Sequence, residues 1–191
     1  MTGTGDGGTH QNDVLADLAA LPPSATRDAY LEFVSSNGDA ALRREGGPEH
    51  LTASCFVFSP DLTRTLLCFH RKGGFWVQFG GHLEPQDASL ASAAQREARE
   101  ESGIDDLALL SAEIVDLDRH DLHGGFSCAA HWDTGFVAVV AAAATISVSD
   151  ESDDVRWFPV DALPEGAVAG LAERLRRARE AAVDILPSRA P

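Results

Sequence analysis

The chain has 191 residues, of which 44% are hydrophobic, and its formal net charge is −15. This length and apolar content suffice for one domain with its own core. The negative charge argues against a nucleic acid or an anionic membrane as partner, because both require a basic surface. A small anionic substrate stays open, since a bound metal and a few arginines can reverse the potential inside one cleft.

The first residues, 1–11, are rich in Gly and Thr and are expected to form a disordered tail. They lack the basic start and apolar stretch of a signal peptide, and the apolar run at 136–146 is too short to cross a membrane. The three cysteines have no CxxC spacing, and Cys55 and Cys68 lie in apolar runs that predict buried, inert thiols. We therefore expect a cytoplasmic protein.

Two short helices are predicted near the N-terminus, at 13–21 and 26–36, the second with Ser24 as its N-cap. Together they define an N-terminal helical extension over residues 12–46. This extension either packs on the main domain or contributes to a homodimer interface, and the sequence does not separate the two.

The remaining residues alternate between strand-like and helical patterns. Residues 51–59 and 65–71 predict a hairpin, and 75–79 predicts a strand that leads into Gly80-Gly81. After a helix in the nineties, the pattern gives a strand at 107–117, a loop at 119–125, one long or two short strands within 131–148, a strand at 154–160 and a helix at 168–186. This order predicts an α/β fold, an α/β/α sandwich on a mixed central β-sheet.

The helix before Gly103 carries three glutamates at positions i, i+3 and i+4, namely Glu97, Glu100 and Glu101. On a helical wheel Glu101 falls within the apolar arc that includes Leu90, while Arg96 points away. A carboxylate directed at a core is costly unless it is paired, protonated or bound to a metal. The helix geometry therefore leaves two interpretations, a solvated charged helix or a site for a hard cation such as Mg²⁺.

The same stretch resembles the Nudix box, G-x5-E-x7-R-E-U-x-E-E-x-G-U, in which U is apolar. The matching residues are Gly81, Arg96, Glu97, Ala98, Glu100, Glu101, Gly103 and Ile104. Two departures occur in the loop half, because Asp87 replaces the expected Glu and eight residues rather than seven separate it from Arg96.

Segments outside the box also resemble a Nudix subgroup, so that the likeness covers about residues 27–165. It implies a Nudix-type fold, with a Nudix hydrolase domain at 47–187. It further implies an enzyme that uses Mg²⁺, or Mn²⁺ in its place, to hydrolyse the diphosphate bond of a nucleoside diphosphate linked to another group.

Carried over by position, the resemblance makes Glu97, Glu100 and Glu101 the metal ligands. Arg96 becomes the arginine that braces the helix against a carboxylate, and Gly81 permits close approach of the backbone.

Other roles follow from sequence position. Gly103 is expected to end the helix, and Asp87 to complement its dipole as a cap. Glu84 is a further candidate ligand.

The general base is assigned to the box acids Glu101 or Glu97, or to Glu151 in a later acidic loop. Glu151 is as well explained as a solvated turn residue.

For a small nucleotide or diphosphate substrate, the candidate contacts are Arg71, His82, His131 and Asp133. For each of the two histidines, a hydrogen-bonded structural role is the more common outcome.

Two other functions remain open from the sequence. An enzyme similar to isopentenyl diphosphate isomerase would use histidine and glutamate ligands with a cysteine acid–base, and the pair His70 and His82 suggests it. A non-catalytic nucleotide-sensing module is the other, although such domains have eroded boxes and all three glutamates are present here.

Overall fold

The computed structural model describes residues 8–122, 127–148 and 152–186. Its helices are α1 (Gln11–Ala20), α2 (Ala25–Asn37), α3 (Leu90–Ser102) and α4 (Leu171–Ile185), with short 3-10 turns at η1 (Gly38–Leu42) and η2 (Arg44–Gly46). Its strands are β1 (Glu49–Phe58), β2 (Arg64–His70), β3 (Phe75–Val77), β4 (Phe79–His82), β5 (Asp116–Asp121), β6 (Ala130–Val139) and β7 (Ser152–Pro159). No helix in these described ranges is both long and apolar enough to span a bilayer.

Strand β1 is the centre of a mixed, seven-stranded sheet with the order β3-β2-β1-β6-β5. It pairs in parallel with β6 and antiparallel with β2, which confirms the predicted hairpin. Two strands lie off this path: β4 pairs antiparallel with β1, and β7 pairs antiparallel with β2. The mixed sheet agrees with the predicted α/β class.

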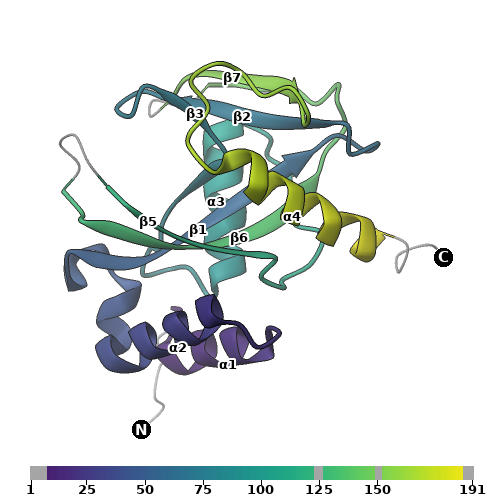
Figure 1. The fold of residues 1–191 in the computed structure, drawn as a ribbon. Coiled ribbons are helices and arrows are strands. Elements are labelled where there is room, and N and C mark those ends of the chain that lie inside the picture. Colours follow the sequence, from purple (N-terminus) through teal and green to yellow (C-terminus); the bar gives the residue numbers. More distant parts are fainter. Residues whose placement is uncertain (1–7, 123–126, 149–151, 187–191) are drawn as a thin grey trace, which may run out of the picture.

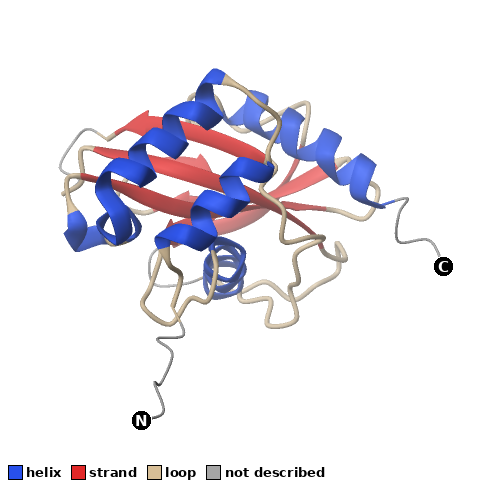
Figure 2. Cartoon of the chain, turned by 90° about the horizontal axis from the view of Figure 1, so that it is seen from below, coloured by secondary structure: helices blue, strands red, loops and turns tan. Residues whose placement is uncertain are grey.

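The alternation of side chains along β1 explains why both faces of the sheet are covered. Cys55 and Val57 belong to the apolar cluster that includes Leu90 of α3, whereas Phe56 and Phe58 belong to the cluster around α4. Accordingly, α3 and α4 lie on opposite faces of the sheet (Figures 1 and 2). This is the expected α/β/α sandwich.

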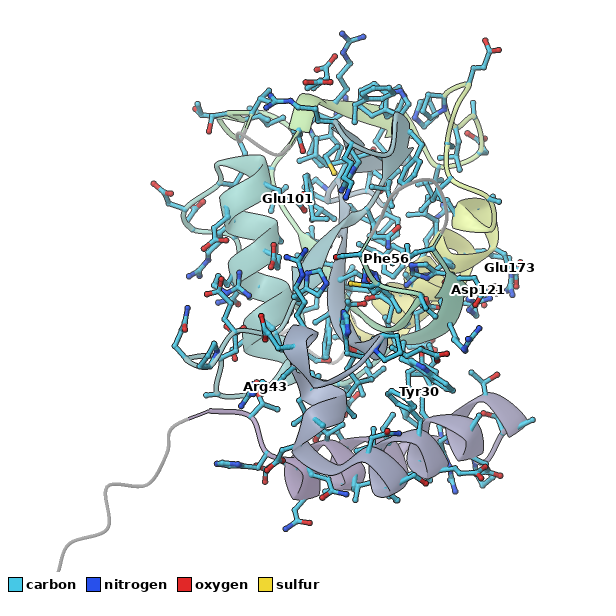
Figure 3. All side chains as sticks on the ribbon, turned by 90° about the vertical axis from the view of Figure 1, so that its left-hand side faces the viewer. Tyr30, Arg43, Phe56, Glu101, Asp121 and Glu173 are labelled. Atoms are coloured by element: carbon cyan, nitrogen blue, oxygen red, sulfur yellow. The ribbon has the colours of Figure 1, made fainter. Side chains whose placement is uncertain are left out.

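The N-terminal helices use their apolar stripe within the chain. Tyr30 of α2 is fully buried, and its hydroxyl donates a hydrogen bond to the Asp133 carbonyl at 2.8 Å (Figure 3). Phe33 stacks on Trp132 with ring centroids 4.4 Å apart. Of the two alternatives for the extension, packing against the sheet is therefore observed.

The strand predicted at 107–117 was wrong over 107–115, and only its last two residues lie in a strand, β5. Only Leu109 of this segment forms an isolated bridge, to Ala138, before β5 begins at Asp116. Leu107 and Leu110 are buried from an irregular segment, so their apolar character reflects packing rather than a strand. Strand β5 continues to Asp121, through polar residues that were expected to be loop, because an edge strand tolerates charge.

Candidate functional site

Helix α3 is fixed at both ends by its own sequence. The Ser89 hydroxyl accepts from the Ser92 N–H, and the Ser92 hydroxyl accepts from the Ser89 N–H, which forms a reciprocal N-cap. Gly103 ends the helix in the left-handed conformation, with φ 67°. Ser89, and not Asp87, therefore caps the helix, which corrects the expectation for Asp87.

The glycine pair on β4 brings this strand close to the glutamates of α3. A Cβ on Gly81 would lie 2.5 Å from Oε1 of Glu97, so a side chain there would displace this carboxylate from its observed position. Gly80 adopts φ 155° and a Cβ there would collide with Ser54 on β1. The predicted close approach at Gly81 is thus present in the structure.

Glu101 points from α3 toward the sheet (Figure 3) and is 6% exposed. Its Oε2 accepts a hydrogen bond from the Gly80 N–H at 2.8 Å, and Cys68 Sγ lies 3.8 Å from its Oε1. The helical wheel correctly predicted that this carboxylate lies on the buried face. A carboxylate buried beside the Gly80 backbone is a hard oxygen donor of the kind that binds a cation.

The helical wheel predicted that Arg96 points away from the core. Its side chain is instead folded against the loop that precedes α3. Its Nε and Nη2 donate to the two oxygens of Asp87 at 3.1 and 2.9 Å, and Nη2 also donates to the His82 carbonyl at 3.0 Å. Asp87 is 4% exposed and accepts the Glu84 N–H as well. This bidentate ion pair joins Asp87, which replaces the longer Glu of the box, to the bracing arginine Arg96.

Two glutamates converge on the outer edge of the same guanidinium. Arg96 Nη1 lies 2.9 Å from Oε1 of Glu97 and 3.2 Å from Oε2 of Glu100. Glu84 is half-exposed, 3.8 Å from the guanidinium. One cationic nitrogen is therefore already shared by two box carboxylates, and this all-oxygen donor set fits Mg²⁺.

The Asp87→Asn variant is expected to lose about 1.5–3 kcal/mol of unfolding free energy, because an amide cannot accept both guanidinium bonds in a buried position. Urea denaturation of wild-type and variant protein measures the change. Asp105→Asn, an exposed residue after the helix, is the matched control and should stay near wild type. Equal stabilities of Asp87→Asn and wild type would show that the brace does not stabilise the loop.

The remaining predicted site residues have different surroundings. Arg71 is half-exposed at the end of β2, where its Nε donates to Asp153 at 2.6 Å and Nη2 donates to the Ser152 carbonyl at 3.1 Å. Glu151, the loop candidate for the general base, lies outside the described residues.

Asp133 lies in an internal ion-pair network on the α4 side of the sheet. Its oxygens accept from the Thr52 and Ser54 hydroxyls at 2.8 and 2.6 Å and from Arg174 at 2.6 Å, and the residue is 3% exposed. Both carboxylate oxygens are thus engaged by protein groups on the face opposite α3. This differs from the expected substrate contact and gives Asp133 a structural environment.

His82 and His131 are brought together, but with residues that the sequence analysis did not single out. They are joined by His50 and Cys128, and the ligand atoms of the four side chains all lie within 4.8 Å of one another. Burial lowers the pKa of His50, and burial with the neighbouring histidines lowers that of His82 to about 4 and that of His131 to about 3. The rings are therefore neutral at neutral pH.

Cys55 and Cys68 are buried, as predicted, and burial raises the pKa of both thiols. For Cys68 the adjacent Glu101 carboxylate raises the pKa further. Neither thiol has the electropositive setting that activates a cysteine.

The family model for the NUDIX domain matches residues 48–178. The chain therefore belongs to the Nudix family, a class of hydrolases that act on phosphoric anhydride bonds. A search of curated protein sequences found no match.

Solved structures share the fold at low sequence identity. A NUDIX-family hydrolase from Clostridium perfringens has 24% identity over 72% of this chain and 97% of its own, with a TM-score of 0.55. A C. elegans Ap4A hydrolase binary complex has 17% identity over 70% and 98%, with a TM-score of 0.58. The NUDIX domain of Shewanella oneidensis NrtR, complexed with ADP ribose, has 18% identity over 79% and 97%, with a TM-score of 0.57.

Proposed function

We propose that this protein is a Mg²⁺-dependent pyrophosphohydrolase that cleaves the diphosphate linkage of a nucleoside diphosphate joined to another group. The observation that carries the proposal is the clustering of Glu97, Glu100 and Glu101 on α3, with Glu97 and Glu101 against the Gly80-Gly81 pair of β4. Two of these carboxylates share one cationic nitrogen, and the third is buried beside the backbone of β4.

Glu97, Glu100 and Glu101 would hold the metal, with Mn²⁺ as a substitute and Glu84 at the rim. When bound, the metal neutralises diphosphate oxygens and lowers the pKa of a coordinated water. Glu97 or Glu101 would accept the proton from the attacking water.

Other residues would contribute by positioning the carboxylates and the substrate. The pair formed by Arg96 and Asp87 fixes the loop relative to the helix, so the carboxylates are held before substrate arrives. Arg71 projects at the half-exposed end of β2, where a guanidinium suits a phosphate group.

The structural relatives with named ligands suggest where to look for substrate. One is an Ap4A hydrolase and another is complexed with ADP ribose, and both compounds contain phosphoric anhydride bonds beside a nucleoside. We propose a small nucleotide of this kind as substrate.

The test is phosphate or nucleotide release from a panel that contains ADP-ribose, a dinucleotide polyphosphate, a nucleotide sugar and nucleoside triphosphates. The assay is run with Mg²⁺, with Mn²⁺ and with chelator. We expect turnover of at least one compound that requires metal and is lost in Glu100→Gln. An inert panel, together with retained Mg²⁺ binding by calorimetry, would instead support a nucleotide sensor.

A further inference from the structure

We propose that His50, His82, Cys128 and His131 form a second metal site, separate from the box carboxylates, that binds Zn²⁺ with four protein ligands. Their nitrogen and sulfur atoms gather within 4.8 Å at one point, although the residues are far apart in sequence. This site would be structural, and it does not depend on the proposed hydrolase activity.

The strand pairing builds the cluster. His50 on β1 lies directly beside His131 on β6 in the parallel register, and His82 at the end of β4 pairs opposite Thr52, two residues along β1. The three rings have centroid separations of 4.9, 5.2 and 5.1 Å. Three strands therefore deliver one imidazole each to the same point.

Cys128 completes the cluster from the segment that leads into β6. Its Sγ is 3.9 Å from Nε2 of His82, and the residue is 8% exposed. The segment is itself anchored, because the Ala129 N–H donates to the Pro48 carbonyl, just before β1, at 2.7 Å. The thiol is thus held at the cluster and is shielded from solvent.

Two nitrogens of the cluster lack any other explanation. Nε2 of His50 and Nε2 of His131 are buried, and neither has a hydrogen-bond partner among the described residues. His50 is fully buried, and its other ring nitrogen lies 3.4 Å from the Gly47 carbonyl. That contact favours the tautomer in which Nε2 carries the lone pair, the arrangement found in metal-bound histidines. Buried polar atoms without partners are rare and costly, and a bound cation would satisfy both.

The donor set selects the metal. Neutral imidazoles and a thiolate suit Zn²⁺, whereas Mg²⁺ requires oxygen ligands. In a tetrahedral site with Zn–N bonds of about 2.0–2.1 Å and a Zn–S bond of about 2.3 Å, neighbouring ligand atoms are roughly 3.3–3.8 Å apart. The observed spread of 4.8 Å or less needs only small side-chain rotations to reach that geometry. Four protein ligands leave no open position, which is typical of structural zinc.

The location explains why a structural metal would matter here. The His82 carbonyl accepts a hydrogen bond from Nη2 of Arg96, so the residue that supplies a zinc ligand also braces the box arginine. A metal bound to the His82 ring would fix the end of β4 and the loop that runs from there to Asp87. It would also tie together β1, β4 and β6 at this end of the sheet, in addition to their backbone pairing.

The experiment measures metal binding directly on the full-length chain without a histidine tag. Protein kept reduced is stripped with chelator and then titrated with Zn²⁺ or Co²⁺, and metal content after desalting is measured by mass spectrometry. We expect about one tightly held Zn²⁺ per chain. The Co²⁺ form should show the visible absorption of tetrahedral coordination together with a thiolate-to-cobalt charge-transfer band in the near ultraviolet.

Two variants and two controls assign the ligands. Cys128→Ser should abolish the charge-transfer band, and His50→Asn should lower the retained Zn²⁺ at least tenfold. Cys68→Ser, another buried thiol, and Glu101→Gln, at the box, should each retain the metal and the cobalt spectrum.

Wild-type protein that retains no Zn²⁺ after desalting, or that gives a cobalt spectrum without a thiolate band, would overturn the proposal. This readout uses the wild-type chain, so it stands even where a variant does not fold. It is also independent of turnover, so a chain inert toward every diphosphate compound can still confirm the zinc site.

Discussion

Glu101→Gln is expected to lower kcat/KM for the cleaved diphosphate compound by on the order of 10²–10³-fold, the range that follows from losing one preorganised electrostatic group. The amide preserves the shape of the side chain, and its oxygen can still accept the Gly80 N–H that Oε2 accepts at 2.8 Å. What is lost is the negative charge at a site that is 6% exposed, where its interaction with a cation is strong. The measurement is steady-state kinetics over a range of Mg²⁺ concentrations.

Glu32→Gln on α2 is the matched control, because it makes the same change at an exposed helical glutamate. It should leave kcat/KM and metal dependence unchanged. Circular dichroism and urea denaturation should show that Glu101→Gln remains folded, so that the loss of activity reflects the missing charge and not unfolding. Full activity of Glu101→Gln at limiting Mg²⁺ would remove Glu101 from the set of metal ligands.

Local pattern was sufficient to predict the features that depend on residues close in sequence. The spacing of Glu97, Glu100 and Glu101 follows from helical geometry, and Gly103 ends the helix as its type predicts. The hairpin of β1 and β2 was likewise visible as two apolar runs around a turn. In each case the residues that determine the feature lie within a short stretch of the sequence.

Features that depend on strand register could not be predicted in the same way. His50 and His131 are neighbours only because β1 and β6 pair in parallel in one particular register, which no local pattern specifies. The signal that was available, a histidine at the start of each strand, has meaning only once that pairing is known. For Arg96 the helical wheel was wrong because the long side chain reaches back to Asp87, a bracing contact of the kind that the resemblance to the box had implied.

The helix predicted at 168–186 also carries a buried arginine on the apolar face of α4, a position that its helical periodicity alone did not assign. Arg174 is 5% exposed and lies over the Phe56 ring at 5.2 Å. Its Nε lies 2.6 Å from Asp116, and its Nη2 lies 2.6 Å from Asp133. The sequence shows these acids as isolated charges on two different strands, and only the folded sheet places them beneath one guanidinium.

Arg174→Met is therefore expected to lower the free energy of unfolding by about 3–5 kcal/mol, because it leaves buried carboxylates without their cation. The methionine replaces much of the apolar volume of the arginine stem, so the effect reports charge more than packing. Asp133 is the more affected acid, since Asp116 also lies 2.6 Å from Arg177 and keeps that ion pair. Urea denaturation followed by fluorescence and circular dichroism measures the loss.

Arg176→Met makes the same substitution two positions along the helix, where the arginine is half-exposed and pairs with Glu173 and Glu180. It should change stability little, because exposed ion pairs are weak. In the double variant Arg174→Met with Asp133→Asn, the loss should be smaller than the sum of the single losses, since removing both charges avoids the unpaired one. A strictly additive result, or an Arg174→Met protein as stable as Arg176→Met, would show that the network under α4 does not hold the helix to the sheet.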